Sequence, residues 1–333
     1  MNIVEKIYEN KIPENEIFDK KHHSMYCCIA YFNSFCKDRP VHYLKLDDIE
    51  IYYVVSTSKI SILGTLNQYH REEVEKVCTY LFSKYSHKCI DWGGFYEPIT
   101  LSKYPIHKTA IVSDVYMDLP STEEDYLALL NKTTRKHIKY YIRKMKKDYP
   151  DLEFKCYRHQ EITEELVGQI VLFNHQRMEG KNTKSSLDED FIINMYNECQ
   201  DNGIIHTVEL NGKLIAATIN NEEYAHAHLS TIAHDPAFNS YNPGQIALYN
   251  TIVDCISRKC TRFHFLWEIV DYKKRFGGHL VELYYYHIYP NVSLKERKDA
   301  IICDVNCSIM YFQKRSETGR KIIDKVKKIL GRK

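Results

Sequence analysis

The sequence predicts an α/β (α+β) fold of two domains, each with a mixed, mostly antiparallel central sheet flanked by helices. Apolar runs of strand length alternate with helix-length amphipathic segments in both halves of the chain. A length of 333 residues allows two domains of ordinary size, each able to bury a core. We expect an N-terminal domain over residues 1–117 and a C-terminal domain over residues 118–333.

The N-terminal half contains the elements of an α/β unit. Apolar runs predict strands over residues 51–55 and 60–63, followed by a turn at Gly64. A helix is predicted over residues 71–85, and a further strand over 110–116.

The C-terminal half repeats this order. Asn211-Gly212, the strongest short hairpin signal, separates strands over residues 206–210 and 213–219. A strand over 226–234, a helix over 245–257 and a strand over 263–267 follow. The repeated order makes a duplicated fold plausible, although the two halves share little sequence.

A helix over residues 121–148 is predicted to link the halves. Ser121 is the expected N-cap, and Glu124 the returning partner of a capping box. The second part of the helix is basic and contains no acid: Lys132, Arg135, Lys136, Lys139, Arg143, Lys144, Lys146 and Lys147. A spacing of four places basic residues along one face, which favours an anionic partner such as a nucleotide diphosphate, an acidic carrier protein or a nucleic acid. A solvated face offset by acidic neighbours is the alternative.

Composition and charge indicate an ordinary soluble chain. Hydrophobic residues make up 44%, charged residues 27%, and the formal net charge of +2 argues against a dedicated nucleic-acid binder. The 27 tyrosines fit a cleft that contacts sugars or nucleotides, or equally a codon bias. The N-terminus lacks a secretory signal pattern, so we expect a cytoplasmic protein whose 11 cysteines are reduced.

Neither a metal site nor an integral membrane segment is predicted. Cys27-Cys28 lies near His22-His23, but no second pair follows at zinc spacing. No apolar run reaches the length of a membrane helix. The amphipathic segment 318–330 fits docking on the fold or on a second subunit, which would make a homodimer, or contact with an anionic membrane surface.

Two motifs in the C-terminal half suggest group transfer. The strand over 226–234 leads into a helix that begins just after Pro-Gly, where unpaired backbone N–H groups form a seat for phosphate. The residues expected to bind a phosphorylated cofactor are Tyr241, Asn242, Pro243, Gly244 and Gln245. The next strand ends in polar residues and the sequence Tyr272-Lys273-x-x-Phe276-Gly277-Gly278.

This order of elements and motifs, over about residues 118–290, resembles the GNAT acyltransferase superfamily. Within it, the similarity is to the branch of Fem-type peptidoglycan aminoacyltransferases and sugar N-acyltransferases. The resemblance implies two GNAT-like domains and an acyl-coenzyme A donor. Gly244 alone stands where the family's phosphate loop usually has several glycines, so an acyl carrier protein stays open as the donor.

Several residues are candidates for the chemistry. An amine that attacks a thioester needs a base, and we favour Glu268 slightly over His228, which shares a strand face with His226 and Ser230. Asp271 is a third candidate base, unless it only caps the turn. The resemblance implies that Lys273 binds a phosphate or steadies the oxyanion and that backbone N–H groups near His234 contact the thioester carbonyl. Tyr272 is a candidate to contact substrate or to protonate the leaving thiolate.

The acceptor is expected to meet a polar loop and the polar turn. Residues 174–181 interrupt an apolar helical pattern, and this loop resembles the acceptor-binding region of the family, with Arg177 suited to phosphate. The predicted acceptor-binding residues are Arg177, His175, Trp267 and Arg275.

The function predicted from these features is N-acyl transfer. An acyl group would pass from acyl-coenzyme A, or from an acyl carrier protein, to the amine of a nucleotide-linked amino sugar for surface polysaccharide, by direct attack in a ternary complex. A Fem-type aminoacyl-tRNA-dependent peptidoglycan aminoacyltransferase is the second hypothesis. A non-catalytic module that binds a nucleotide or a carrier protein is the third.

Overall fold

The computed structural model describes residues 2–36, 39–180, 187–267 and 271–290, and these residues form two compact units. Of the described residues, unit 1 contains those up to His22, those of 26–113 and those of 282–290. Unit 2 contains His23–Met25 and Asp114–Val281. The units are not consecutive halves of the chain. The second part of β12 (His279–Ile288) pairs with β5 (Cys89–Phe95) of unit 1, whereas we expected all of residues 118–333 to belong to the C-terminal domain.

Unit 1 is a sheet of order β1-β2-β3-β4-β5-β12 with three helices. Its other strands are β1 (Ile3–Tyr8), β2 (Val41–Leu46), β3 (Ile49–Val55), β4 (Lys59–Ile62) and β5 (Cys89–Phe95). The helices are α1 (Glu16–His22), α2 (Ile29–Phe35) and α3 (Arg71–Lys84). Only β4 and β5 run parallel among the described pairs of this unit. Val77 and Leu81 of α3 pack with sheet residues such as Leu44 and Ile51 in one core, so helix and sheet stabilise each other.

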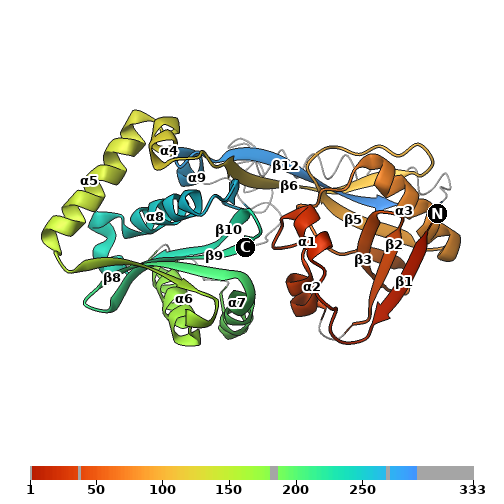
Figure 1. The fold of residues 1–333 in the computed structure, drawn as a ribbon, viewed down its shortest axis with the longest axis horizontal. Helices are drawn as coiled ribbons and strands as arrows, with labels where there is room; N and C mark the ends of the chain where they lie inside the picture. Colours follow the sequence, from red (N-terminus) through yellow and green to blue (C-terminus); the bar gives the residue numbers. More distant parts are fainter. Residues whose placement is uncertain (1, 37–38, 181–186, 268–270, 291–333) are drawn as a thin grey trace, which may run out of the picture. The chain divides into compact units, whose positions relative to one another are not determined.

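Unit 2 is a sheet of order β6-β11-β10-β9-β8-β7. Its strands are β6 (Ile106–Asp118), of which Asp114–Asp118 belong to this unit, β7 (Leu152–Arg158), β8 (Gly203–Leu210), β9 (Lys213–Glu223), β10 (His226–His234) and β11 (Arg262–His264). The helices are α4 (Glu123–Leu129), α5 (Lys132–Asp148), α6 (Glu164–Glu179), α7 (Glu189–Asn202), α8 (Pro243–Ser257) and the short α9 (Asp271–Arg275). Short 3₁₀ turns lie at η1 (His159–Glu161) and η2 (Pro236–Tyr241). Helix α8 covers one side of β8–β10, and α6 and α7 cover the other (Figure 1).

These features confirm the predicted fold class, and several predicted elements occur at the expected positions. The predicted strand 226–234 coincides with β10, and the helix expected over 71–85 is α3. The hairpin of β8 and β9 turns at Asn211 and Gly212, with φ angles of 50° and 74°. Positive φ at both central residues is what a tight hairpin turn of this kind requires. No helix among the described residues is long and apolar enough to cross a bilayer.

The single linking helix predicted over 121–148 is wrong. Leu130 is extended, and the chain forms two helices, α4 and α5, of which α5 begins after Asn131. The side chain of Asn131 accepts a hydrogen bond from the backbone N–H of Thr134, so a second N-cap interrupts the predicted helix. The first N-cap is Thr122, which binds the N–H of Asp125, rather than Ser121.

Two further boundaries differ from the prediction. The polar loop expected over 174–181 is helical as far as Glu179, with Gly180 as the C-cap and Lys181 outside the described residues. The strand expected over 263–267 ends at His264, because Leu266 takes a positive φ of 55° and turns the chain. The amphipathic segment 318–330 also lies outside the described residues.

Candidate active site

Two neighbouring parallel strands of unit 2 separate part-way along their length. β10 pairs with β11 only from His226 to His228, opposite Arg262 to His264, yet β10 continues to His234. The chain after β11 stays with β6, since the N–H of Phe265 donates to the carbonyl of Val115 at 2.7 Å. The edge of β10 beyond His228 therefore leaves its parallel neighbour, and a ligand with hydrogen-bonding groups can enter at this point.

A β-bulge marks the place where the strands part. The pairing of β10 with β9 shifts register between Leu229 and Thr231, which places Ser230 at the bulge. Before the bulge, Leu229 packs in the core that contains α8, whereas after it Ala233 packs in the core of α6 and α7. His226 and His228 share a face as expected, since both rings contact His264, whereas Ser230 lies at the bulge where the regular alternation is interrupted. The Ser230 hydroxyl is buried, and no described residue is its hydrogen-bond partner.

The N-terminus of α8 lies against the end of β10. Asn242 is left-handed with φ 49°, Pro243 takes the first helical position, and no described side chain caps the helix. Gly244 is buried, and a Cβ at this position would lie 3.1 Å from Nδ1 of His234. Pro243 has no backbone N–H, and the N–H groups of Gln245 and Ile246 donate to the carbonyl of Asn242, so the helix presents the N–H of Gly244 at its positive end. A side chain at position 244 would crowd this end of the helix.

Arg177 and His175 approach this region from α6. The Arg177 guanidinium is close enough to His234 to contribute to the lowered pKa of that imidazole, although burial is the larger cause. Nε of Arg177 is buried without a described partner. Nε2 of His175 instead pairs with the carbonyl of Leu187, so the ring is tied to the chain before α7. The structure thus brings Arg177 to the predicted phosphate seat, whereas Nε2 of His175 is already paired with the carbonyl of Leu187.

The other residues expected at the helix mouth have structural partners. The Tyr241 hydroxyl donates to Asp148 at 3.0 Å, and the ring lies under the ammonium of Lys144, so this residue holds η2 against α5. The backbone N–H of Gln245 donates to the carbonyl of Asn242 at 3.0 Å. Among the predicted cofactor residues, Gly244 therefore has the placement that best fits contact with phosphate.

A buried aspartate and a row of histidines lie beside the strand separation. Oδ2 of Asp114 is 3.2 Å from Nδ1 of His264, and Nε2 of His264 is 3.3 Å from Nδ1 of His226. The His226 ring in turn stacks on His23, with centroids 5.0 Å apart. We call Asp114, His264 and His226 the buried relay. The sequence predicted neither Asp114 nor His264, because their proximity depends on the registers of β11 with β6 and with β10.

Burial determines how the buried relay carries charge. It raises the pKa of Asp114 to about 6 and lowers the pKa values of His264 and His226 to about 3. At neutral pH the carboxylate is ionised and both imidazoles are neutral. Nδ1–H of His264 then donates to Asp114, and Nε2 of His264 accepts from Nδ1–H of His226. Nε2 of His226 is then the nitrogen of the buried relay that keeps a free lone pair, and the His226 ring is only partly buried.

His228, the predicted rival base, is fully buried. Its ring stacks on His264 with a centroid distance of 4.5 Å and an interplanar angle of 7°. Burial holds its pKa well below the ordinary value, and neither ring nitrogen has a hydrogen bond of good geometry within the described chain. His228 thus packs the relay, and the structure gives it no path to solvent.

The Tyr-Lys-x-x-Phe-Gly-Gly motif holds the chain after β11. Nζ of Lys273 is buried and donates to the carbonyls of Leu266, at 2.8 Å, and Trp267. A Cβ at Gly277 would lie 2.6 Å from Sδ of Met117, and one at Gly278 would lie 2.6 Å from Val115. Tight backbone packing on β6 therefore explains both glycines, and Lys273 fixes the turn that ends β11.

The remaining predicted residues cluster around this turn. Tyr272 packs at the edge of the unit 2 core, Trp267 is half-buried, and Asp271 and Arg275 are exposed on α9. Glu268, the favoured base, lies outside the described residues.

The basic helix α5 contributes an exposed surface. Within the part of the chain that the structure describes, none of its eight lysines and arginines forms an ion pair with an acidic side chain. Lys132, Arg135, Lys136 and Lys139 line a surface hollow of about 430 Å³ together with Glu124 of α4. We call these four residues the basic face.

A comparison with protein families indicates the class of this region. Residues 132–274 match the family described as the acetyltransferase (GNAT) domain. This segment is similar to GNAT acetyltransferase domains. The matched segment contains β10, the strand separation, the N-terminus of α8 and the basic face, whereas Asp114 of the buried relay lies outside it. No curated protein matches the sequence.

Solved structures extend the likeness over most of the chain. FemX superposes with a TM-score of 0.57 at 8% identity, covering 81% of this chain and 94% of FemX. A conserved protein of unknown function from Bacteroides thetaiotaomicron superposes with a TM-score of 0.52 at 14% identity, covering 78% and 89% of the two chains. At these identities the likeness shows the fold alone. The family match supports the predicted GNAT superfamily for residues 132–274, and the branch within it stays a prediction.

Proposed function

We propose that the chain is an N-acyltransferase whose donor is an acyl thioester, bound where β10 separates from β11. The observation that carries this proposal is the coincidence of three features within the GNAT-like segment 132–274. These are the strand separation with its bulge at Ser230, the N-terminus of α8 at Gly244 without a side-chain cap, and Nε of Arg177, which is buried without a described partner. Acyl-coenzyme A fits this seat, because its phosphates would meet the helix N-terminus and Arg177 while its pantetheine lies along β10. An acyl carrier protein is the alternative donor.

The buried relay supplies the proton path. The acceptor amine attacks the thioester carbonyl, a C–N bond forms, the C–S bond breaks, and the thiolate leaves. The amine proton passes to Nε2 of His226, the Nδ1 proton of His226 passes to His264, and that of His264 passes to Asp114. A carboxyl with a pKa of about 6 suits a proton acceptor that works near neutral pH. Glu268, which follows Trp267, stays the alternative base, and Asp271 a third.

We propose a nucleotide-linked amino sugar as the acceptor. Its diphosphate fits the basic face, whose four cations have no ion-pair partner among the described residues. His175, Trp267 and Arg275 remain the proposed acceptor contacts, and Tyr272 remains a proposed substrate contact. Lys273 instead holds the turn, because its Nζ donates to two backbone carbonyls. The N-acylated nucleotide sugar formed in this reaction would be a precursor of surface polysaccharide.

The basic face also supports a second candidate, a Fem-type aminoacyl transfer that uses aminoacyl-tRNA. A tRNA is a polyanion that a row of unpaired cations attracts. The similarity to FemX concerns the fold and is compatible with both candidates.

Release of free thiol tests the proposed function. The full chain is incubated with acetyl- or 3-hydroxyacyl-coenzyme A and a panel of nucleotide-linked amino sugars, and thiol is measured with a chromogenic reagent. We expect thiol release that requires both substrates and falls in Asp114→Asn. Transfer only from aminoacyl-tRNA would establish the second candidate. Binding of donor and acceptor without turnover from any donor would indicate a non-catalytic module.

A further inference from the structure

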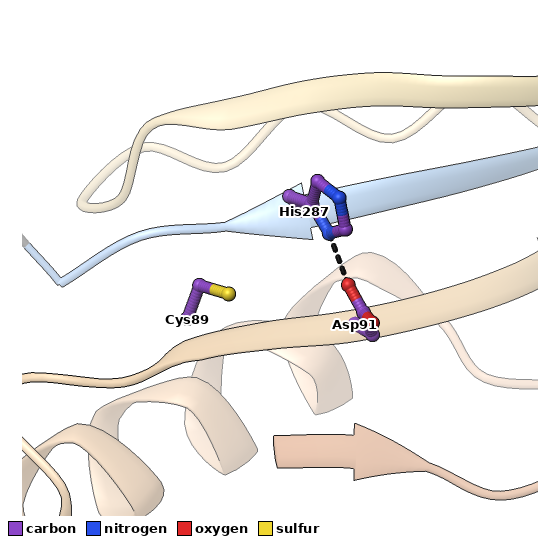
Figure 2. Close-up of side chains that lie close together, drawn as sticks. All are labelled: Cys89, Asp91 and His287. Atoms are coloured by element: carbon purple, nitrogen blue, oxygen red, sulfur yellow. Dashed lines mark ion pairs between the residues drawn. The ribbon is translucent and has the colours of Figure 1, made fainter. Parts of the chain in front are cut away.

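We propose that unit 1 contains a zinc site formed by Cys89 and Asp91 of β5 and His287 of β12 (Figure 2). One ligand atom from each of the three side chains lies within 4.8 Å of the other two. All three residues belong to unit 1, outside residues 132–274, so the proposal is independent of the acyl-transfer site.

The strand pairing places the three side chains together. Cys89 and Asp91 are two residues apart on β5, so both project from the same face of the sheet. His287 is the direct antiparallel partner of Asp91, and its Nδ1 points at the Asp91 carboxylate, with which it pairs (Figure 2). The backbone of two paired strands therefore fixes the spacing of the ligands before any metal binds.

The ligand types select the metal. One thiolate, one imidazole and one carboxylate match the ligands that Zn²⁺ uses, whereas Ca²⁺ and Mg²⁺ prefer oxygen ligands alone. A tetrahedral ion bound by three protein ligands has one further position for water. Asp91 and His287 border a cavity of about 270 Å³ that is also lined by Thr109 and Tyr285, which gives such a water room.

Lys59 now neutralises the carboxylate. Its Nζ forms an ion pair with Oδ2 of Asp91. The Lys59 side chain is 46% exposed, so its flexible stem can carry the ammonium into water when a dication replaces it. The thiol of Cys89 is half-buried, and burial raises its pKa, so binding of zinc releases a proton from the thiol.

A second trio of the same residue types is a natural comparison. Cys156, His206 and Asp254 of unit 2 also lie within 4.8 Å of one another. The Asp254 carboxylate, however, is bound by two guanidinium groups, Nε of Arg258 at 2.8 Å and Nη2 of Arg158 at 3.3 Å. Two fixed cations repel a dication more than one mobile lysine does. Zinc should therefore prefer the trio of unit 1.

The position of the site suggests its role. β12 is far from β5 in sequence, and in unit 1 it joins the sheet as the strand next to β5. A zinc ion coordinated by Asp91 of β5 and His287 of β12 would cross-link these two strands. The ion would thus stabilise the pairing of β12 in unit 1.

Cobalt and zinc binding to the full chain tests the proposal. After treatment with a chelator, the protein is titrated with Co²⁺, whose thiolate charge-transfer absorption reports a cysteine ligand, and Zn²⁺ affinity is measured by competition. We expect one equivalent with a thiolate band, which Cys89→Ser abolishes and the matched control Cys156→Ser retains. His287→Gln should weaken Zn²⁺ by more than the roughly 10–100-fold that loss of an outer-sphere partner causes.

Lys59→Gln keeps the test decisive if the ligand variants fold poorly. Removing the competing ammonium should tighten Zn²⁺ binding by up to about fivefold, the value of an exposed ion pair. Absence of a thiolate band in the unaltered protein overturns the proposal. A band that persists in Cys89→Ser, or Zn²⁺ affinity that is unchanged in both His287→Gln and Lys59→Gln, overturns it equally.

Discussion

The carboxylate of Asp114 lies 3.2 Å from Nδ1 of His264, and both side chains are almost completely buried. A buried carboxylate is stabilised by a donor, and a buried imidazole needs an acceptor, so each residue satisfies the other. The pair also fixes the tautomer of His264, and through it the direction of the hydrogen bond with His226. The proposed proton path depends on this contact.

The pH dependence of turnover should report this pair. If the relay is the base, kcat/KM should fall as the pH falls below about 6, where Asp114 takes up a proton. Asp114→Asn accepts the hydrogen bond of His264 but cannot accept its proton, so kcat should fall by roughly 10²–10⁴-fold. The KM of the donor should change little. The matched control is Asp48→Asn, which alters an exposed carboxylate of unit 1. An unchanged pH profile in Asp114→Asn would assign the base to another residue, with Glu268 the first to test.

The stability of the fold should also depend on pH through His264. Its pKa is lowered to about 3 in the folded state, so the unfolded chain binds a proton first as the pH falls below about 6.5. The stability that the neutral ring provides is present above this pH and is lost progressively towards pH 3. Asp114, whose pKa is raised, acts in the opposite direction below about pH 6, because the folded state then binds its proton more readily.

Urea unfolding at pH 7.5 and pH 5 checks this expectation. His264→Gln removes one titrating ring, so the loss in free energy of unfolding between the two pH values should shrink by about 1–2 kcal/mol. Exposed His279→Gln is the control, and it should leave the loss unchanged. An equal loss in His264→Gln and the unaltered protein would mean that the ring is not held neutral by burial.

Gly244→Val should weaken the donor selectively. The new Cβ would lie 3.1 Å from Nδ1 of His234, and the γ methyl groups would crowd the helix N-terminus further. Loss of one phosphate hydrogen bond of about 1.4 kcal/mol corresponds to a tenfold rise in the KM of the donor. The acceptor KM should stay within about twofold. Gly168→Ala in α6 is the control, since no atom lies within 4 Å of the added Cβ. Equal rises in both KM values would point to misfolding instead.

How far the sequence predicted the structure depends on the range of the interactions involved. The hairpin at Asn211-Gly212, strand β10 and helix α8 follow from local turn chemistry and periodicity, and all three are present. The break at Leu130 was missed because Asn131 acts as a second N-cap inside a helical pattern. The residues of β12 were assigned to the C-terminal domain, because the pairing of β12 with β5 is a long-range contact that periodicity does not encode.

The same distinction applies to the candidate site. Gly244 was predicted from local chemistry, since an uncapped helix start after Pro-Gly is visible in sequence. Lys273 was predicted to bind a phosphate or to steady the oxyanion, whereas in the structure its Nζ donates to backbone carbonyls of the turn after β11. Asp114 and His264 were not found, because an apolar strand context gives no signal that two distant strands place them together. An isolated aspartate within the apolar run of β6 was the one available hint.

Reversing one charge on the basic face should weaken an anionic acceptor in a salt-dependent way. Arg135 lines the surface hollow of α4 and α5 and has no ion-pair partner among the described residues, so Arg135→Glu removes an attraction and adds a repulsion. At low ionic strength we expect the KM of a nucleotide-linked acceptor to rise by about tenfold, and the kcat to change little, because the hollow contributes binding and not chemistry. Since salt screens exposed charges over about 10 Å at 0.1 M and about 3 Å at 1 M, the difference should largely disappear at high salt. The control is Lys76→Glu on α3, which makes the same change of charge at an exposed site of unit 1. If the acceptor KM of Arg135→Glu equals that of the control at every salt concentration, the acceptor's phosphates bind elsewhere, and the unpaired cations of α5 serve another polyanion.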